Sequence, residues 1–170
     1  KTSVKDEVTD MKMVKAEKDM RIIDTVEYHN LKKGKKYKIT GTLMDKETGK
    51  AARSASGRKI TESVEFVAEG KDGTAEVEFV FDGSNLAGKT LVAFEKLYYG
   101  EKLYAVHTDL EDEDQTIHVP SAGTTASEKN TGTHHAYAGE YVELTDTIEY
   151  RNLLPGETYT LHGTVVEKET

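Results

Sequence analysis

Three polar residues at fixed spacing, His107, Asp112 and Gln115, precede a short apolar run that ends at Val119. A histidine can take a proton from a hydroxyl near neutral pH, and an acid bonded to its ring can hold the ring in the required tautomer. A glutamine carboxamide offers a carbonyl carbon that an activated hydroxyl can attack. The segment therefore holds a base, an orienting acid and an acyl group, and it needs a hydroxyl from elsewhere in the chain.

A second acid, Glu95, closes the run Val92-Ala-Phe-Glu95. Apolar residues occupy both faces of residues 90–95, which is typical of a central strand. Burial disfavours the charged form of a carboxyl, so we expect the pKa of Glu95 to be raised and its side chain to be protonated. A protonated carboxyl can donate a hydrogen bond to the carbonyl of Gln115 and stabilise a developing oxyanion.

Each of these residues also has an ordinary structural interpretation. His107 and Gln115 can be hydrogen-bonded core residues, and Glu95 can lie at the surface where its strand ends. Their occurrence together favours the chemical interpretation.

Metal binding is a weaker hypothesis. The acidic run 109–114 departs from the EF-hand pattern, because Asp114 stands where that loop needs glycine, so we expect a solvated turn. Adjacent strand residues point to opposite faces, so His134 and His135 make a poor metal site. We predict no metal and no cofactor.

The elements that position these residues follow from an internal repeat. Residues 24–48 recur as residues 146–170 at a constant offset of 122, with 13 identical positions. A period near 120 residues suits tandem whole domains. We predict one complete domain over residues 1–120. Residues 121–170 would be a linker and the N-terminal part of a second, homologous domain, too short to close alone.

The local pattern is β throughout. Apolar and polar residues alternate in residues 37–43 and 76–81, and Gly-containing turn signals separate such runs. We therefore predict an all-β protein with an immunoglobulin-like antiparallel β-sandwich, in a tandem repeat whose second copy is truncated.

Composition excludes several classes of function. A net charge of −8 argues against nucleic-acid binding, and no apolar run is long enough to insert this piece into a membrane. Without cysteine there are no disulfides, thiolate nucleophiles or Cys-based zinc sites.

The motif Val92-Ala-Phe-Glu95 and the pattern His107-x4-Asp112-x2-Gln115-Thr resemble the Thr–Gln ester-bond domains, or VaFE-repeat domains, of Gram-positive surface adhesins. The repeated Asp24-Thr-Val-Glu-Tyr motif extends the resemblance over residues 1–120 and into the fragment. In that family a first-strand threonine is esterified to a last-strand glutamine with loss of ammonia. The resemblance implies a crosslink to Gln115, with His107, Asp112 and Glu95 as catalytic groups.

The threonine is identified through the repeat. Thr124-Thr-Ala resembles the family's opening Thr-Thr-Ala, and subtracting the offset gives Thr2. Thr9 is the fallback and Ser3 a less favoured one. Thr124 would be the unpaired crosslink threonine of the second copy.

By the same resemblance the protein is a structural stalk module that reacts once and is not an enzyme. We expect a place on the bacterial cell surface, anchored to the cell wall through other regions, with neighbouring stalk domains of the same polypeptide as partners. The sequence indicates no host ligand. The alternatives are a Lys–Asn isopeptide domain, using Asn30 or Asn85, and a plain immunoglobulin-like binding module without a crosslink.

Overall fold

The computed structural model describes residues 2–7 and 11–167, and that part of the chain contains strands, one 3-10 helix and no α-helix. No helix within these ranges has the length and apolar character to cross a membrane. The elements of the sandwich are β1 (Thr2–Asp6), β2 (Met20–Tyr28), β3 (Lys36–Asp45), β4 (Lys50–Ala51), β5 (Thr61–Val67), β6 (Gly73–Phe81), β7 (Thr90–Tyr99), β8 (Lys102–His107), η1 (Glu113–Gln115) and β9 (Thr116–His118).

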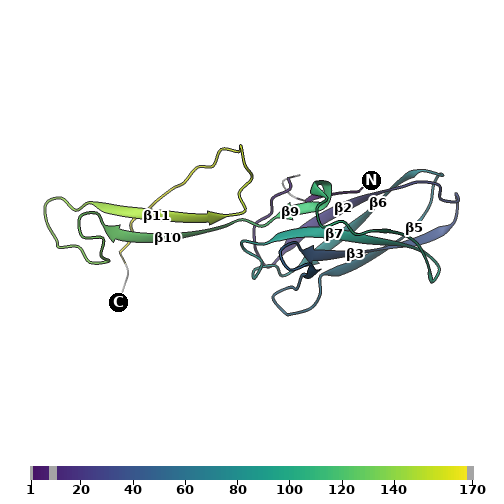
Figure 1. Ribbon diagram of the computed structural model, residues 1–170, viewed down its shortest axis with the longest axis horizontal. Coiled ribbons are helices and arrows are strands. Elements are labelled where there is room, and N and C mark those ends of the chain that lie inside the picture. The colour runs from purple at the N-terminus through teal and green to yellow at the C-terminus, as the bar shows by residue number, and fades with distance from the viewer. Residues whose placement is uncertain (1, 8–10, 168–170) are drawn as a thin grey trace.

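Two antiparallel sheets make up this sandwich (Figure 1). The first has the order β1-β2-β6. The second has the order β4-β3-β7-β8, with β5 also paired to β3 and β9 also paired to β7. The fold is therefore the predicted all-β, immunoglobulin-like antiparallel sandwich. In it β7 is a central strand, as the apolar residues on both of its faces predicted.

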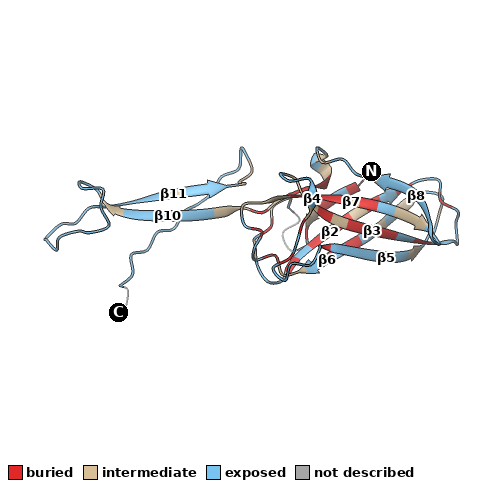
Figure 2. Cartoon of the chain, turned by 60° about the horizontal axis from the view of Figure 1, so that its bottom comes forward, coloured by how far each residue is buried: buried red, intermediate tan, exposed pale blue. Residues whose placement is uncertain are grey.

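The core lies between the two sheets. Alternate residues of β2 are buried along the whole strand, so the strand has one inward and one outward face. Ile22 and Phe79 from the first sheet join Ile39, Leu91 and Ile117 from the second in one buried cluster. Figure 2 shows the buried residues concentrated on β2, β3 and β7.

Gly41 allows the two sheets to approach closely. It lies in β3 opposite Glu95 of β7, and a Cβ added there would come within 2.7 Å of the Phe79 ring. Separations below 3.0 Å require a neighbour to shift, and Phe79 is fully buried. Glycine at this position therefore makes room for the large aromatic core residue.

Two further strands, β10 (Ser121–Glu128) and β11 (Leu144–Arg151), form a separate antiparallel pair that extends from the end of the sandwich (Figure 1). Their register repeats that of β1 and β2. Thr2 pairs with Val26, and Thr124 pairs with Ile148, which lies 122 residues further on. Most residues of this pair are exposed (Figure 2).

Candidate active site

Thr2 and Gln115 meet at the edge of the sandwich. Thr2 is the first residue of β1, and Gln115 closes η1 immediately before β9. Both are buried, Gln115 completely. The Thr2 hydroxyl contacts the carboxamide of Gln115 directly. The two ends of the sandwich's chain are thus in contact through a hydroxyl and an acyl group.

The neighbours of Gln115 fix the orientation of its carboxamide. With its nitrogen toward Asp24, the amide donates to Asp24 Oδ1 at 3.2 Å. Its oxygen then accepts from the Ser3 backbone N–H at 3.2 Å and from the Thr2 hydroxyl. The opposite orientation would place the amide nitrogen against the Ser3 N–H, donor against donor.

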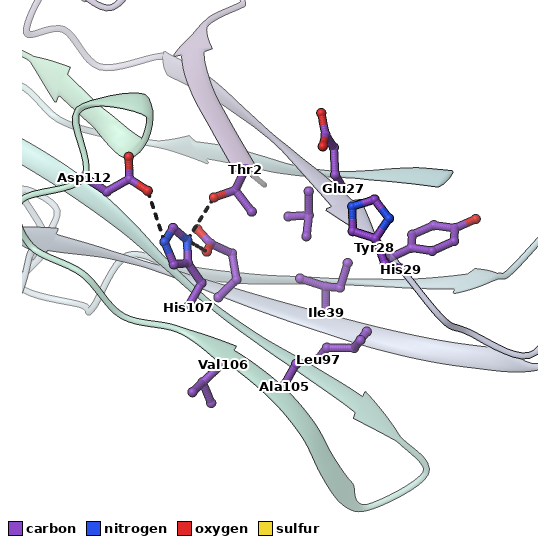
Figure 3. Close-up of a pocket in the computed structure, with 12 residues that line it drawn as sticks. Thr2, Glu27, Tyr28, His29, Ile39, Leu97, Ala105, Val106, His107 and Asp112 are labelled. Carbon is purple, nitrogen blue, oxygen red and sulfur yellow. Dashed lines mark hydrogen bonds and ion pairs between the residues drawn. The ribbon is translucent and has the colours of Figure 1, made fainter. Parts of the chain in front are cut away.

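His107 lies beside the hydroxyl. It is the last residue of β8 and is paired with Glu95 of β7, so two neighbouring strands deliver both side chains to one place. His107 Nδ1 is 2.9 Å from Thr2 Oγ1, and His107 Nε2 is 3.0 Å from Asp112 Oδ2 (Figure 3). A carboxylate at Nε2 holds the proton on that nitrogen, which leaves Nδ1 as the acceptor for the threonine hydroxyl.

The turn before β9 fixes Asp112. Its Oδ1 accepts from the Asp114 backbone N–H at 2.8 Å, which caps η1. Its backbone carbonyl accepts from the Thr116 hydroxyl at 2.8 Å. The second carboxylate oxygen is thereby directed at His107. Lys46, which is only 22% exposed, pairs with Glu111 and Glu113 and steadies this acidic turn.

Two buried carboxyls complete the site. Burial raises the pKa of Glu95 to about 10, and the nearby charge of Asp24 adds to the rise. Burial also raises the pKa of Asp24 to about 6, an effect reduced by its hydrogen bonds to Glu95 and Gln115. At neutral pH Glu95 is therefore protonated while Asp24 carries the charge. Glu95 Oε2 also lies 3.1 Å from His107 Nδ1.

The sequence prediction named five residues of this site, and the structure brings all five together: Thr2, Glu95, His107, Asp112 and Gln115. The other candidate hydroxyls lie elsewhere. Ser3 is exposed and contributes its backbone N–H, and Thr9 falls outside the described residues. Thr124 is exposed on β10, in the strand position equivalent to Thr2.

Two sequence expectations need correction. Gln115 was expected to begin the last strand, but it ends η1, and Thr116 is as deeply buried as Ile117. The carboxyl placed against the Gln115 carboxamide is that of Asp24, whereas Glu95 was expected there. Sequence reasoning treated Asp24 only as part of the repeated motif. Its signal was an acid on the inward face of β2, in phase with Ile22 and Val26.

Other candidate groups lie apart from this site. Asn30 and Asn85 are exposed in turns, and Asn85 donates to the Arg53 carbonyl at 3.1 Å. His134 Nδ1 lies 2.8 Å from the Ala126 carbonyl oxygen. Over residues 2–7 and 11–167 no group of three or more His, Asp or Glu side chains is arranged to hold a metal ion.

The family model of the T-Q ester bond containing domain matches residues 1–119 and again residues 120–170. The chain belongs to this family. A search of curated protein sequences finds no significant match to the T-Q chain.

Solved structures show a related fold. A bacterial adhesin from Mobiluncus mulieris, described as containing intramolecular disulfide, isopeptide and ester bond cross-links, matches the T-Q chain with a TM-score of 0.57 at 14% identity. The match covers 88% of this chain and 74% of the adhesin chain. A second crystal form of that adhesin matches with a TM-score of 0.49 at 13% identity, over 88% and 76% of the two chains.

Proposed function

We propose that this domain welds itself by an ester bond between Thr2 Oγ1 and the side-chain carbonyl carbon of Gln115, releasing ammonia. The observation that carries the proposal is the Thr2 hydroxyl in contact with the Gln115 carboxamide, with His107 Nδ1 2.9 Å from the hydroxyl oxygen. A base, a nucleophile and an acyl group are thus in one place. Membership of the T-Q ester bond containing domain family supports the same chemistry.

The first half of the reaction forms the C–O bond. His107 Nδ1 takes the hydroxyl proton, and Asp112 stabilises the resulting imidazolium. Thr2 Oγ1 adds to the carbonyl carbon of Gln115, whose oxygen becomes negatively charged. The Ser3 backbone N–H, 3.2 Å from that oxygen, donates to it as the charge develops.

The second half breaks the C–N bond. The amide nitrogen must gain a proton to leave as ammonia, and the imidazolium of His107 returns the one it took. Asp24 holds this nitrogen through its Oδ1, and protonated Glu95 keeps the local charge at one carboxylate. The balance is one hydroxyl and one carboxamide consumed, and one ester and one ammonia formed.

The fold supplies the rate and limits the reaction to one event. Contact between the two reacting groups replaces an encounter in solution, an advantage of about 7–11 kcal/mol in well-oriented systems. Gln115 is consumed and fully buried, so each chain reacts once and has no turnover.

The position of the bond suits a stalk module. It joins the first strand to the segment that leads through β9 into β10, so tension along the polypeptide enters and leaves the sandwich at the two bonded residues. We place the protein on a bacterial cell surface as part of an adhesin, held in a cell wall by other regions and flanked by neighbouring domains. The likeness to an adhesin with ester bond cross-links supports this role.

Intact mass of matched variants tests the proposal. The unmodified sequence should be lighter than its calculated mass by one ammonia, about 17 Da. Thr2→Val and Gln115→Ala should each abolish the loss, whereas Thr9→Val should retain it. Full calculated mass for the unmodified chain, or a normal loss in Thr2→Val, would contradict the proposal.

A further inference from the structure

A pocket of about 350 Å³ opens directly beside the reacting groups (Figure 3). Thr2, His107 and Asp112 lie at one end, and Tyr28 and His29 at the other. Its walls come from β2 of the first sheet and from β7 and β8 of the second. Figure 3 shows Ile39, Leu97 and Ala105 along it, so its interior is largely apolar.

The register of the strands relates this pocket to a missing length of β-ladder. The pairing of β1 with β2 begins at Thr2–Val26, and the pocket continues past Glu27, Tyr28 and His29. The other edge of β2 pairs with β6 as far as Tyr28–Gly73, so only the β1 side remains for another strand there.

The second unit shows what such a strand looks like. There the ladder contains three more pairs before the Thr124–Ile148 pair, formed by residues 121–123 with residues 149–151. Subtracting the offset of 122 places residues 149–151 on Glu27, Tyr28 and His29. The residues that pair with the pocket edge in the second unit are Ser121, Ala122 and Gly123, which are all small.

We propose that the pocket is the seat of an extended peptide segment that runs into Thr2 from its N-terminal side, with small residues like those of 121–123. Three residues of strand extend about 10 Å, which matches the three remaining positions of β2. Strand residues alternate in direction, so the residue two before Thr2 points inward with it, as Ala122 does relative to Thr124. An alanine there would meet Tyr28, Ile39 and Leu97.

Filling the pocket has a consequence for the ester. His107 is 36% exposed and lines the pocket together with Thr2 and Glu95, so this is the route by which water reaches the site. A seated strand would close the route and protect the ester from hydrolysis. This consequence rests on the proposed crosslink, whereas the seating of the strand does not.

The test compares two extensions of the chain. Pro-Ser-Ala placed before Lys1 reproduces the register of residues 120–122, and Pro-Ser-Glu has the same length with a charged side chain at the inward position. In the Gln115→Ala background, which cannot form the ester, the Ala extension should slow hydrogen exchange of amides 27–29 by about tenfold or more. The Glu extension should leave exchange unchanged, and equal exchange with both extensions would overturn the proposal.

A second variant and a second readout complete the test. Ala105→Phe should fill the pocket and remove the protection given by the Ala extension. In the crosslinked chain the Ala extension should slow alkaline hydrolysis of the ester, followed as a gain of about 18 Da, by roughly tenfold. Protection of amides 27–29 without slower hydrolysis would overturn the shielding role. Absence of any ester in these chains would contradict the crosslink and leave the exchange result to decide the strand.

Discussion

His107 has a partner at each ring nitrogen, the Thr2 hydroxyl at Nδ1 and the Asp112 carboxylate at Nε2. At the scale of single residues the chemistry depends on this arrangement. Asp112 does not touch the reacting atoms. It sets which nitrogen of His107 is free to accept the threonine proton, and is therefore a positioning residue.

Asp112→Asn should accordingly slow ester formation by about a thousandfold or more, because an amide no longer favours the required tautomer and no longer stabilises the imidazolium. The crosslinked fraction, read from intact mass over hours to days after purification, measures this rate. Asp109→Asn is the matched control, since Asp109 lies in the same acidic run and accepts only from the Glu111 N–H. Complete crosslinking of freshly purified Asp112→Asn would contradict the assignment.

The raised pKa of Glu95 predicts how stability depends on pH. Its folded-state pKa, about 10, lies above the model value of 4.5, so the folded chain binds more protons than the unfolded chain between these values. The free energy of unfolding should therefore fall as pH rises through this range, by up to about 1 kcal/mol per pH unit.

Urea unfolding between pH 5 and 9 in a Thr2→Val background measures the dependence without the crosslink, with the range chosen below the pKa of about 10. Glu95→Gln keeps a neutral donor of similar shape and should flatten the curve. Parallel curves with and without Glu95→Gln would show that Glu95 is ionised in the folded state.

At the scale of strands, the sequence was informative where side-chain periodicity decides the structure. Alternation predicted β3 and β6, and apolar residues on both faces predicted the central position of β7. The start of β9 could not be predicted in the same way. A run of acids preceding Gln115 has no period of its own, and its 3-10 turn depends on the cap at Asp112 and on the contact with Lys46.

The site was predictable to a similar extent. Spacing brought together Glu95, His107, Asp112 and Gln115, and the repeat pointed to Thr2. Asp24 was missed because its contacts come from another strand and an identical motif recurs at Asp146. Only the burial phase of β2 distinguishes it, and that phase requires the strand to be placed against Gln115.

Close approach at Gly41 gives a prediction at this scale. Gly41→Ala should destabilise the sandwich by about 1–3 kcal/mol, because the new methyl group must displace the buried Phe79 ring. Urea unfolding in the Thr2→Val background gives the value. Gly123→Ala, at a strand glycine with open space around it, is the control and should change stability little. Equal stability of Gly41→Ala and its parent would show that the core at Phe79 can adjust freely.

At the scale of the whole molecule, the bond changes what unfolding means. Joining Thr2 to Gln115 closes a loop of about 100 residues, for which chain entropy gives roughly 4.7 kcal/mol. Relative to Gln115→Ala, the crosslinked sandwich should melt at a temperature higher by roughly 15–20 °C, by calorimetry. Equal melting temperatures in two chains of verified mass would contradict this.

Force should reveal the same bond more directly. In single-molecule pulling from both ends, Gln115→Ala should lengthen by roughly 350–400 Å when the sandwich unfolds, since the segment between the two residues becomes extended. The crosslinked chain should lack this step, because tension passes through the ester. An equal step in both chains would show that the bond is absent or joins other residues.

The most direct test of the central claim is a peptide map. Trypsin cleavage after Lys1, Lys5, Lys102 and Lys129 isolates residues 2–5 and residues 103–129. They should appear as one species, lighter than their sum by about 17 Da. Mild alkali should split it into the free 2–5 peptide and a 103–129 peptide with glutamate at position 115, which an isopeptide bond would resist. A free 2–5 peptide before alkali, with an unchanged glutamine at 115, would contradict the ester.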